Sequence, residues 1–250
     1  MTKIQNQSNM NNLNGKTALI TGGTKGIGYG IAESMMAEGM HVLITGRTQA
    51  TVDDAVAALN KSENGKAIGI AADVRDYTTQ VAAVEKVVTT WGKLDILIAN
   101  AGVGHFAPIE QMTAQQWQDT IDINLTGVFH GIKAAIPALK ASEGYFITIA
   151  SLAGTNFFAN GAAYNASKFG LVGFTQAAML DLRKYGIKTT VIMPGSVSTH
   201  FNNRTPSEAD AWKIQPEDLG QITVDLLKIH PRTLPSKVEV RPTIPPSVKR

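Results

Sequence analysis

A tyrosine and a lysine stand four positions apart, at Tyr164 and Lys168, within the proline-free stretch AAYNASKFG. On a helix this spacing makes two side chains near neighbours on one face. A free phenol has a pKa near ~10, and a nearby positive charge typically lowers it by about one to three units. A phenol held in this way can donate a proton near neutral pH. The alternative is that this Tyr–Lys pair, like many at the same spacing, only covers the surface of a helix.

Two further polar residues complete a group that suits carbonyl reduction. Ser151 precedes Tyr164 by 13 residues, which leaves room for a loop between a strand and the next helix. When hydride reaches a carbonyl carbon, negative charge develops on the oxygen, and two donors, one of them also a proton source, stabilise it. Asn124 lies on a long helical stretch, where by position alone it would rather be a helix irregularity or a surface amide. We predict the catalytic group Asn124, Ser151, Tyr164 and Lys168.

The elements that must position these residues follow an α/β pattern. Short apolar runs of strand length cover residues 17–21, 41–45, 67–73, 94–100, 145–151, 188–195 and 237–240. Amphipathic stretches indicate helices at residues 27–38, 76–91, 114–139 and 162–184. Near-continuous apolar strands are buried on both faces, and helical crossovers between them imply parallel pairing. We therefore predict a Rossmann-type, doubly wound parallel sheet of about seven strands with helices on both faces.

The residues that suggest binding fall where these strands end. TGGTKGIG follows the first run, TGRT the second and NAG the fourth, while ASLAG and PGSVST follow the fifth and sixth. Gly, Asn and Pro are also ordinary turn residues, so no single segment decides the matter. Ligands of open α/β sheets bind outside the carboxyl ends of the strands, and the segments together therefore indicate a binding edge.

Three glycines open the first helix, at Gly22, Gly26 and Gly28, with the spacing G-x-x-x-G-x-G. Glycine tolerates unusual backbone angles, lets the backbone approach a pyrophosphate and leaves the helix N-terminus aimed at that anion. A tight turn is the plainer alternative. Because the glycines lie at the first strand–helix junction, they favour nucleotide binding.

The end of the second strand predicts which nicotinamide cofactor binds. An Asp or Glu at this point would bind the ribose 2′-hydroxyl of NAD, but the chain has Gly46, Arg47 and Thr48. Arg47 suits bidentate contact with a phosphate, and Lys25 adds a second positive charge from the glycine loop. We predict that NADP(H) binds and that NAD(H) is disfavoured. The plainer alternative is that Arg47 and Lys25 are ordinary solvated cations on the surface.

The composition of the chain limits which other functions are expected. We expect a single catalytic domain over residues 14–250, preceded by a flexible, Asn/Gln-rich tail over residues 1–13. The net charge of +3 comes without a long Lys/Arg run, so no nucleic-acid partner is expected. The chain has no cysteine and no run of 18 apolar residues, and its five histidines lack metal-ligand spacing. We expect a cytoplasmic protein without a membrane partner or a metal site.

The motifs together resemble the short-chain dehydrogenase/reductase family of the Tyr-x-x-x-Lys type over residues 14–240. The matching segments are TGGTKGIG at 21–28, DV at 73–74, NAG at 100–102, Asn124, Ser151, Tyr164, Lys168 and PGSVST at 194–199. The resemblance implies that Tyr164 is the acid/base, that Ser151 polarises the carbonyl and that Lys168 binds the ribose hydroxyls. It further implies that Asn124 supports a water in a proton relay.

The same resemblance implies the cofactor contacts and the assembly. Asp73 and Val74 would meet the adenine, Asn100 to Gly102 the adenosine side, and Thr199 the nicotinamide amide. The expected cofactor-binding residues are Gly22, Thr24, Lys25, Gly26, Ile27, Gly28, Arg47, Thr48, Asp73, Val74, Asn100, Ala101, Gly102, Tyr164, Lys168, Pro194, Gly195, Val197 and Thr199. A homo-oligomer, a tetramer or a dimer, would form on the helices around 114–139 and 162–184.

We therefore expect an NADPH-dependent carbonyl reductase, working in reverse as an alcohol dehydrogenase on a small-molecule ketone or aldehyde. A 3-oxoacyl thioester is the alternative substrate, disfavoured because the chain ends in LPSKVEVRPTIPPSVKR rather than in a glycine-bearing strand segment. An NADP(H)-binding sensor without turnover is the alternative function. His105, Phe106, Phe157 and Phe158 are candidates to line the pocket, with loop packing as the more ordinary role of each.

Overall fold

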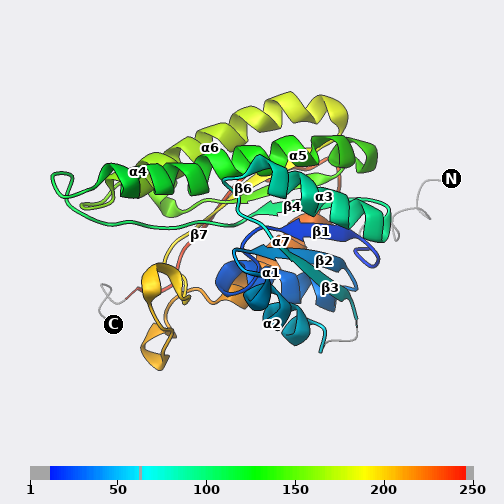
Figure 1. Ribbon diagram of the computed structural model, residues 1–250, viewed down its shortest axis with the longest axis horizontal. Coiled ribbons are helices and arrows are strands. Elements are labelled where there is room, and N and C mark those ends of the chain that lie inside the picture. The colour runs from blue at the N-terminus through cyan, green and yellow to red at the C-terminus, as the bar shows by residue number, and fades with distance from the viewer. Residues whose placement is uncertain (1–11, 62–63, 246–250) are drawn as a thin grey trace.

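The computed structural model describes residues 12–61 and 64–245 (Figure 1). Its strands are β1 (Thr17–Ile20), β2 (His41–Gly46), β3 (Lys66–Ala71), β4 (Ile96–Ala99), β5 (Tyr145–Ile149), β6 (Lys188–Pro194) and β7 (Lys237–Val240). Its α-helices are α1 (Gly26–Ala37), α2 (Gln49–Leu59), α3 (Tyr77–Trp91), α4 (Ala114–Ile121), α5 (Gly127–Ser142), α6 (Ala162–Leu182) and α7 (Pro216–Lys228). A π-helix, Asp122–Thr126, joins α4 to α5.

The strands form one parallel sheet in the order β3-β2-β1-β4-β5-β6-β7. The register aligns Ile20 with Ile44 and with Ile98, so β1, β2 and β4 end almost level. The chain reverses its direction of winding between β1 and β4, and this crevice is where doubly wound sheets bind ligands. The predicted Rossmann-type fold is confirmed.

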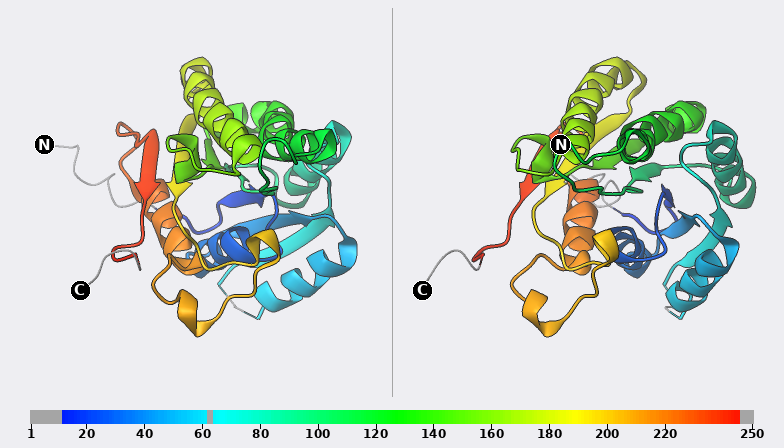
Figure 2. Two further views of the ribbon diagram at one scale, coloured as in Figure 1. Left: turned by 90° about the vertical axis from the view of Figure 1, so that its left-hand side faces the viewer. Right: turned by 60° about the vertical axis from the view of Figure 1, so that its left-hand side comes forward.

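Two hydrophobic clusters cover the two faces of the sheet. The first gathers residues of α1, α2 and α7 under the sheet, including the fully buried Ile31 and Met35. The second gathers residues of α3, α5 and α6 over the other face, where they pack on strand residues such as the fully buried Phe146 of β5. The helices therefore lie in two layers, α3, α5 and α6 on one side and α1, α2 and α7 on the other (Figures 1 and 2).

Several boundaries differ from those predicted. The helix expected over residues 114–139 is divided by the π-helix, and α2 and α7 are helices that the sequence analysis does not single out. Most strands end one or more residues earlier than expected, which leaves Asn100 and Ser151 in the loops that follow. Of the tail expected at 1–13, residues 1–11 lie outside the described part, while Leu13 packs in the core. Among the described residues no helix is long and apolar enough to cross a membrane.

Candidate active site

The loops after β4, β5 and β6 leave the sheet at one end, which faces the viewer in the left panel of Figure 2. Tyr164 and Lys168 lie one turn apart near the start of α6, as their spacing predicts. Lys168 is buried, and its Nζ donates a hydrogen bond of 3.0 Å to the carbonyl oxygen of Ile149, the last residue of β5. The same Nζ lies 5.7 Å from the centroid of the Tyr164 ring.

Ser151 follows β5 and begins a short 3-10 helix, Leu152–Gly154. Its Oγ accepts a hydrogen bond of 3.1 Å from the backbone N–H of Ala153, which fixes the side chain. The hydroxyl is near enough to the Tyr164 phenol to influence its pKa. A strand end and a helix thus bring the predicted proton donor, Tyr164, and the predicted hydrogen-bond donor, Ser151, to the same place.

Desolvation controls both titratable groups of this pair. Burial raises the pKa of Tyr164 above its usual range, and hydrogen bonding with Ser151 opposes that rise. Burial also lowers the pKa of Lys168 to about 8. The pKa of the phenol is therefore shifted in the direction opposite to the one expected from Lys168, because loss of solvent is the largest influence on it.

Asn124 belongs to the π-helix, and its side chain is fully buried. Its Oδ1 accepts from the N–H of Val103 at 2.8 Å, and its Nδ2 donates to the carbonyl of Val103 at 2.9 Å and to Ser167 Oγ at 3.0 Å. A Cβ built on Gly102 would lie 3.3 Å from Asn124 Oδ1 and 3.7 Å from Lys168 Nζ. The amide therefore ties the loop after β4 to α6 beside the lysine.

The glycine loop packs against the loop after β4. Gly22 and Gly26 have φ of 65° and 59°, a region that favours glycine. A Cβ on Gly22 would lie 2.9 Å from Ala101 Cα, and one on Gly28 would lie 2.5 Å from Asn100 Nδ2. The backbone at each of these positions needs a residue without a side chain.

Asn100 and Thr21 hold the same two loops together. The Nδ2 of Asn100 donates to the carbonyls of Thr21 and Gly22, each at 3.0 Å. The Oγ1 of Thr21 accepts from the N–H groups of Asn100 at 3.0 Å and Ala101 at 3.1 Å. Thr21 is a residue that the sequence analysis quotes in its motif without giving it a role.

The segment after β6 closes the other side of the glycine loop. Pro194 ends β6, and the N–H of Gly195 donates to the carbonyl of Val240 at 2.8 Å. Val197 forms an isolated parallel bridge with Ile214. The Cγ2 of Thr199 lies 3.3 Å from a Cβ built on Gly26, so the residue expected at the nicotinamide amide stands over the glycine loop.

The end of the crevice near β2 and β3 carries the predicted phosphate and adenine contacts. Thr24 packs against Gly46, because a Cβ on Gly46 would lie 2.6 Å from its Cγ2. The adjacent cations, Lys25 and Arg47, are exposed, and within residues 12–61 and 64–245 neither forms an ion pair. Thr48 caps α2, Ile27 packs on the core at the start of α1, and Val74 is buried.

Arg75, which the sequence analysis does not single out, engages the Asp73 carboxylate. Its Nη2 lies 2.6 Å from Asp73 Oδ2, and its Nε lies 3.1 Å from each carboxylate oxygen. Hydrogen bonding with Arg75 lowers the pKa of Asp73, and the charge of Arg47 adds to that shift. Asp73, expected at the adenine, is thus an ionised group between two arginines.

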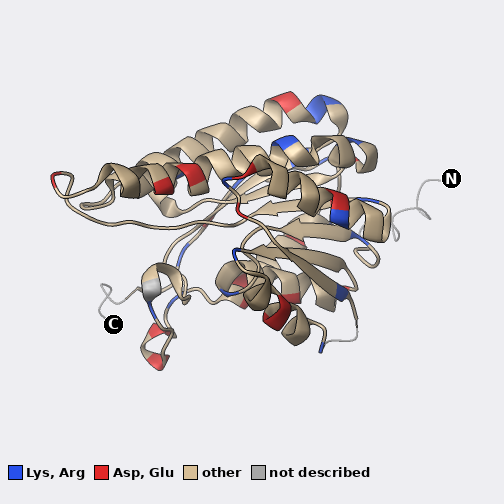
Figure 3. Ribbon diagram, in the orientation of Figure 1, with Lys and Arg blue, Asp and Glu red and all other residues tan. Residues whose placement is uncertain are grey.

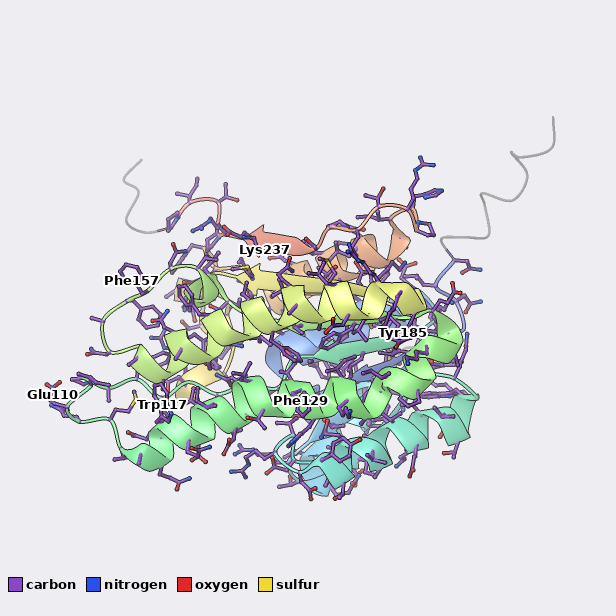
Figure 4. All side chains as sticks on the ribbon, turned by 90° about the horizontal axis from the view of Figure 1, so that it is seen from above. Glu110, Trp117, Phe129, Phe157, Tyr185 and Lys237 are labelled. Carbon is purple, nitrogen blue, oxygen red and sulfur yellow. The ribbon has the colours of Figure 1, made fainter. Side chains whose placement is uncertain are left out.

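Aromatic rings surround the Tyr164 phenol. Its ring centroid lies 5.3 Å from that of Phe106, 5.7 Å from Phe201 and 6.5 Å from Phe158. Phe157 is 87% exposed and lies on the outer loop labelled in Figure 4. Phe201 has no sequence signal, because only the packing of three separate loops brings it to the tyrosine.

The chain is similar to short-chain dehydrogenases over most of its length. The profile of the family described as short chain dehydrogenase matches residues 16–210. The trans-4-hydroxycyclohexanecarboxylate dehydrogenase of Sinomonas cyclohexanicum is 38% identical over 74% of this chain and 73% of that protein. The 3-oxoacyl-acyl-carrier-protein reductase of Escherichia coli is 34% identical over 84% of this chain and 85% of that protein. A metagenomic short-chain oxidoreductase solved in complex with NADP has a TM-score of 0.81 at 31% identity, covering 94% of this chain and 100% of that one.

Proposed function

The chain belongs to the short-chain dehydrogenase family of oxidoreductases, and we propose that it is an NADP(H)-dependent carbonyl reductase. A ketone or aldehyde, NADPH and a proton give the alcohol and NADP⁺, and the reverse reaction is an alcohol dehydrogenation. The observation that carries the proposal is the meeting of the Ser151 hydroxyl and the Tyr164 phenol beside the buried Lys168.

The residues present fit a nicotinamide dinucleotide. Gly22 and Gly26 have the backbone angles, and Gly28 the close approach, that let a pyrophosphate reach the start of α1. Lys168 would hold the nicotinamide ribose, and Thr199, which stands over Gly26, the nicotinamide amide. Bound NADPH supplies the hydride that adds to the carbonyl carbon.

The protein's own groups act on the carbonyl oxygen. Tyr164 donates its phenol proton to that oxygen, and the hydroxyl of Ser151 donates a hydrogen bond to it as negative charge develops. Asn124 holds the loop after β4 against α6 through Val103 and Ser167. It thereby fixes the position of the loop after β4 relative to the Tyr164 phenol.

The preference for NADP(H) over NAD(H) rests on the charges near β2. Lys25 and Arg47 lie on adjacent loops and leave positive charge where a 2′-phosphate would bind. Asp73 lies within electrostatic reach of Arg47, and Arg75 already neutralises its carboxylate. A phosphate at this point therefore meets net positive charge.

Oxidation of NADPH, followed at 25 °C against ketones, aldehydes, keto sugars and 3-oxoacyl thioesters, tests the proposal. Turnover of a ketone or aldehyde supports it. Tight NADPH binding without turnover of any panel member would instead support a nucleotide sensor. Turnover confined to 3-oxoacyl thioesters would support the alternative substrate, the class named for the Escherichia coli relative.

The assembly we propose is a homo-oligomer formed through α5 and α6. Between Lys168 and Asp181, α6 carries no charged residue, and it appears as an unbroken tan stretch in Figure 3. Phe129 on α5, labelled in Figure 4, is an exposed apolar side chain. Phe169 and Leu180 on α6 are exposed as well. Apolar surface of this kind marks protein–protein contact, and a second copy of the chain would bury it.

Leu180→Glu should then lower the mass measured by light scattering to that of a monomer.

A further inference from the structure

Three phenylalanines from three separate loops meet at the phenol that we assign as proton donor. Phe106 follows β4, Phe158 follows β5 and Phe201 follows β6. The centroid of the Phe106 ring lies 5.9 Å from that of Phe158 and 6.4 Å from that of Phe201. Because Phe106 also touches Tyr164 at 5.3 Å, the three rings form one continuous aromatic collar around it.

Hydrogen bonds to backbone carbonyls hold the first two rings of this collar. The N–H of Ala107 donates to the carbonyl of Asn160 at 3.0 Å, which joins the loop after β4 to the loop after β5. The side chain of Asn165 on α6 donates to the carbonyls of Ala153 and Asn156, each at 2.8 Å. The loop that carries Phe158 is thereby fixed to the helix that carries Tyr164.

The third ring is held from the cofactor side. The N–H of Phe201 donates to Thr199 Oγ1 at 3.3 Å, and Thr199 packs over Gly26 of the glycine loop. Gly104 makes room for two members of the collar, since a Cβ there would lie 2.7 Å from the Phe201 ring and 2.8 Å from the Phe106 ring. The rings therefore have fixed positions beside the phenol.

The collar remains open to a ligand. Its three rings are between 37% and 48% exposed, in contrast to aromatic side chains of the core such as Phe146, which is fully buried. Half-exposed hydrocarbon beside the reacting atoms favours an apolar group and disfavours a charged one.

We infer that the collar of Phe106, Phe158 and Phe201 selects carbonyl substrates whose carbonyl carbon bears an uncharged aromatic or alicyclic group. This inference rests on the proposed function, because the collar acts only on a substrate that Tyr164 protonates. A carboxylate on the ring would have to lose its hydration among these aromatic side chains, and an aryl or cycloalkyl ketone would not.

The test compares matched ketones at saturating NADPH. Acetophenone is compared with butanone, and the methyl ester of para-acetylbenzoate with the free acid. Since even one methylene in an apolar pocket changes specificity by about 10-fold or more, we expect kcat/KM for acetophenone and for the ester to exceed that of each partner by at least ~10-fold. Phe106→Ala and Phe158→Ala should each remove most of that preference, and Phe157→Ala, the exposed neighbour, should leave it unchanged.

The outcomes separate the two proposals. Reduction of butanone and para-acetylbenzoate as fast as their partners would overturn the role of the collar and leave the carbonyl reductase standing. Equal loss of the substrate preference in Phe157→Ala and Phe158→Ala would also overturn the role of the collar, since the loss would then not depend on contact with Tyr164. NADPH binding without turnover of any of the four ketones would overturn the role of the collar. The carbonyl reductase would be overturned as well only if the aldehydes, keto sugars and 3-oxoacyl thioesters of the wider panel also failed to react.

Discussion

The ammonium of Lys168 donates a hydrogen bond of 3.0 Å to the backbone carbonyl of Ile149. This contact ties the start of α6 to the end of β5, and it accounts for how a lysine can be buried in the crevice. Burial nevertheless lowers the pKa of this side chain to about 8. Keeping Lys168 charged in the folded protein therefore costs folding stability.

That cost predicts a pH-dependent stability. Below pH 8, Lys168 is charged in both the folded and the unfolded chain, and the cost is present in full. Between pH 8 and 10.5 the unfolded chain binds the additional proton, so folding gains stability as pH rises. The free energy of unfolding of Lys168→Met minus that of the unaltered protein should therefore be larger at pH 7 than at pH 10.5, by up to about 3 kcal/mol. Urea unfolding across this range measures it, and a difference independent of pH would contradict the assignment.

Asn124→Ala should lower both stability and turnover. The substitution leaves the N–H and carbonyl of Val103 without their partner, and each buried unsatisfied group costs about 1–3 kcal/mol. Asn60 is a matched control, because it makes the same pair of bonds to Ala67, each 2.8 Å long, far from the crevice. We expect Asn60→Ala to lower the free energy of unfolding while kcat stays unchanged. Equal effects of both variants on kcat would count against a positioning role for Asn124.

Arg47→Asp should reduce the preference for NADPH over NADH by about 10- to 100-fold, the value of a charge-assisted hydrogen bond to phosphate. The ratio of kcat/KM for the two cofactors measures the effect. Lys66→Asp makes the same charge change on an exposed residue at the opposite end of the sheet, where β3 begins. An unaltered preference in Arg47→Asp, or the same loss in both variants, would place the 2′-phosphate elsewhere.

The strands and the catalytic residues were accessible to sequence analysis because each depends on local pattern. Buried parallel strands have apolar runs, and the spacing of Tyr164 and Lys168 fixes a helical face whatever surrounds it. Ser151 needed only a loop of plausible length after β5. These predictions use one segment at a time, and the structure brings the three residues together where β5 ends and α6 begins.

Features that depend on packing between segments were not accessible in this way. The division of the helix at 114–139 by a π-helix leaves no composition signal, and it is this irregularity that carries the buried Asn124. Phe201 and Arg75 gain their roles from neighbours on other loops. The raised pKa of Tyr164 has the same origin, because desolvation is a property of the assembled crevice and not of the Tyr–Lys spacing.

Tyr164→Phe tests the central claim most directly, because it removes one oxygen and keeps the ring that packs against Phe106 and Phe201. The measurement is single-turnover oxidation of bound NADPH by a ketone substrate, with NADPH affinity determined on the same sample and Tyr185→Phe, on the surface, as the control. We predict unchanged NADPH affinity and a rate at least ~10²-fold lower in Tyr164→Phe, the contribution typical of general acid catalysis, with Tyr185→Phe unaffected. Full turnover in Tyr164→Phe would show that the proton comes from another group and would contradict the account.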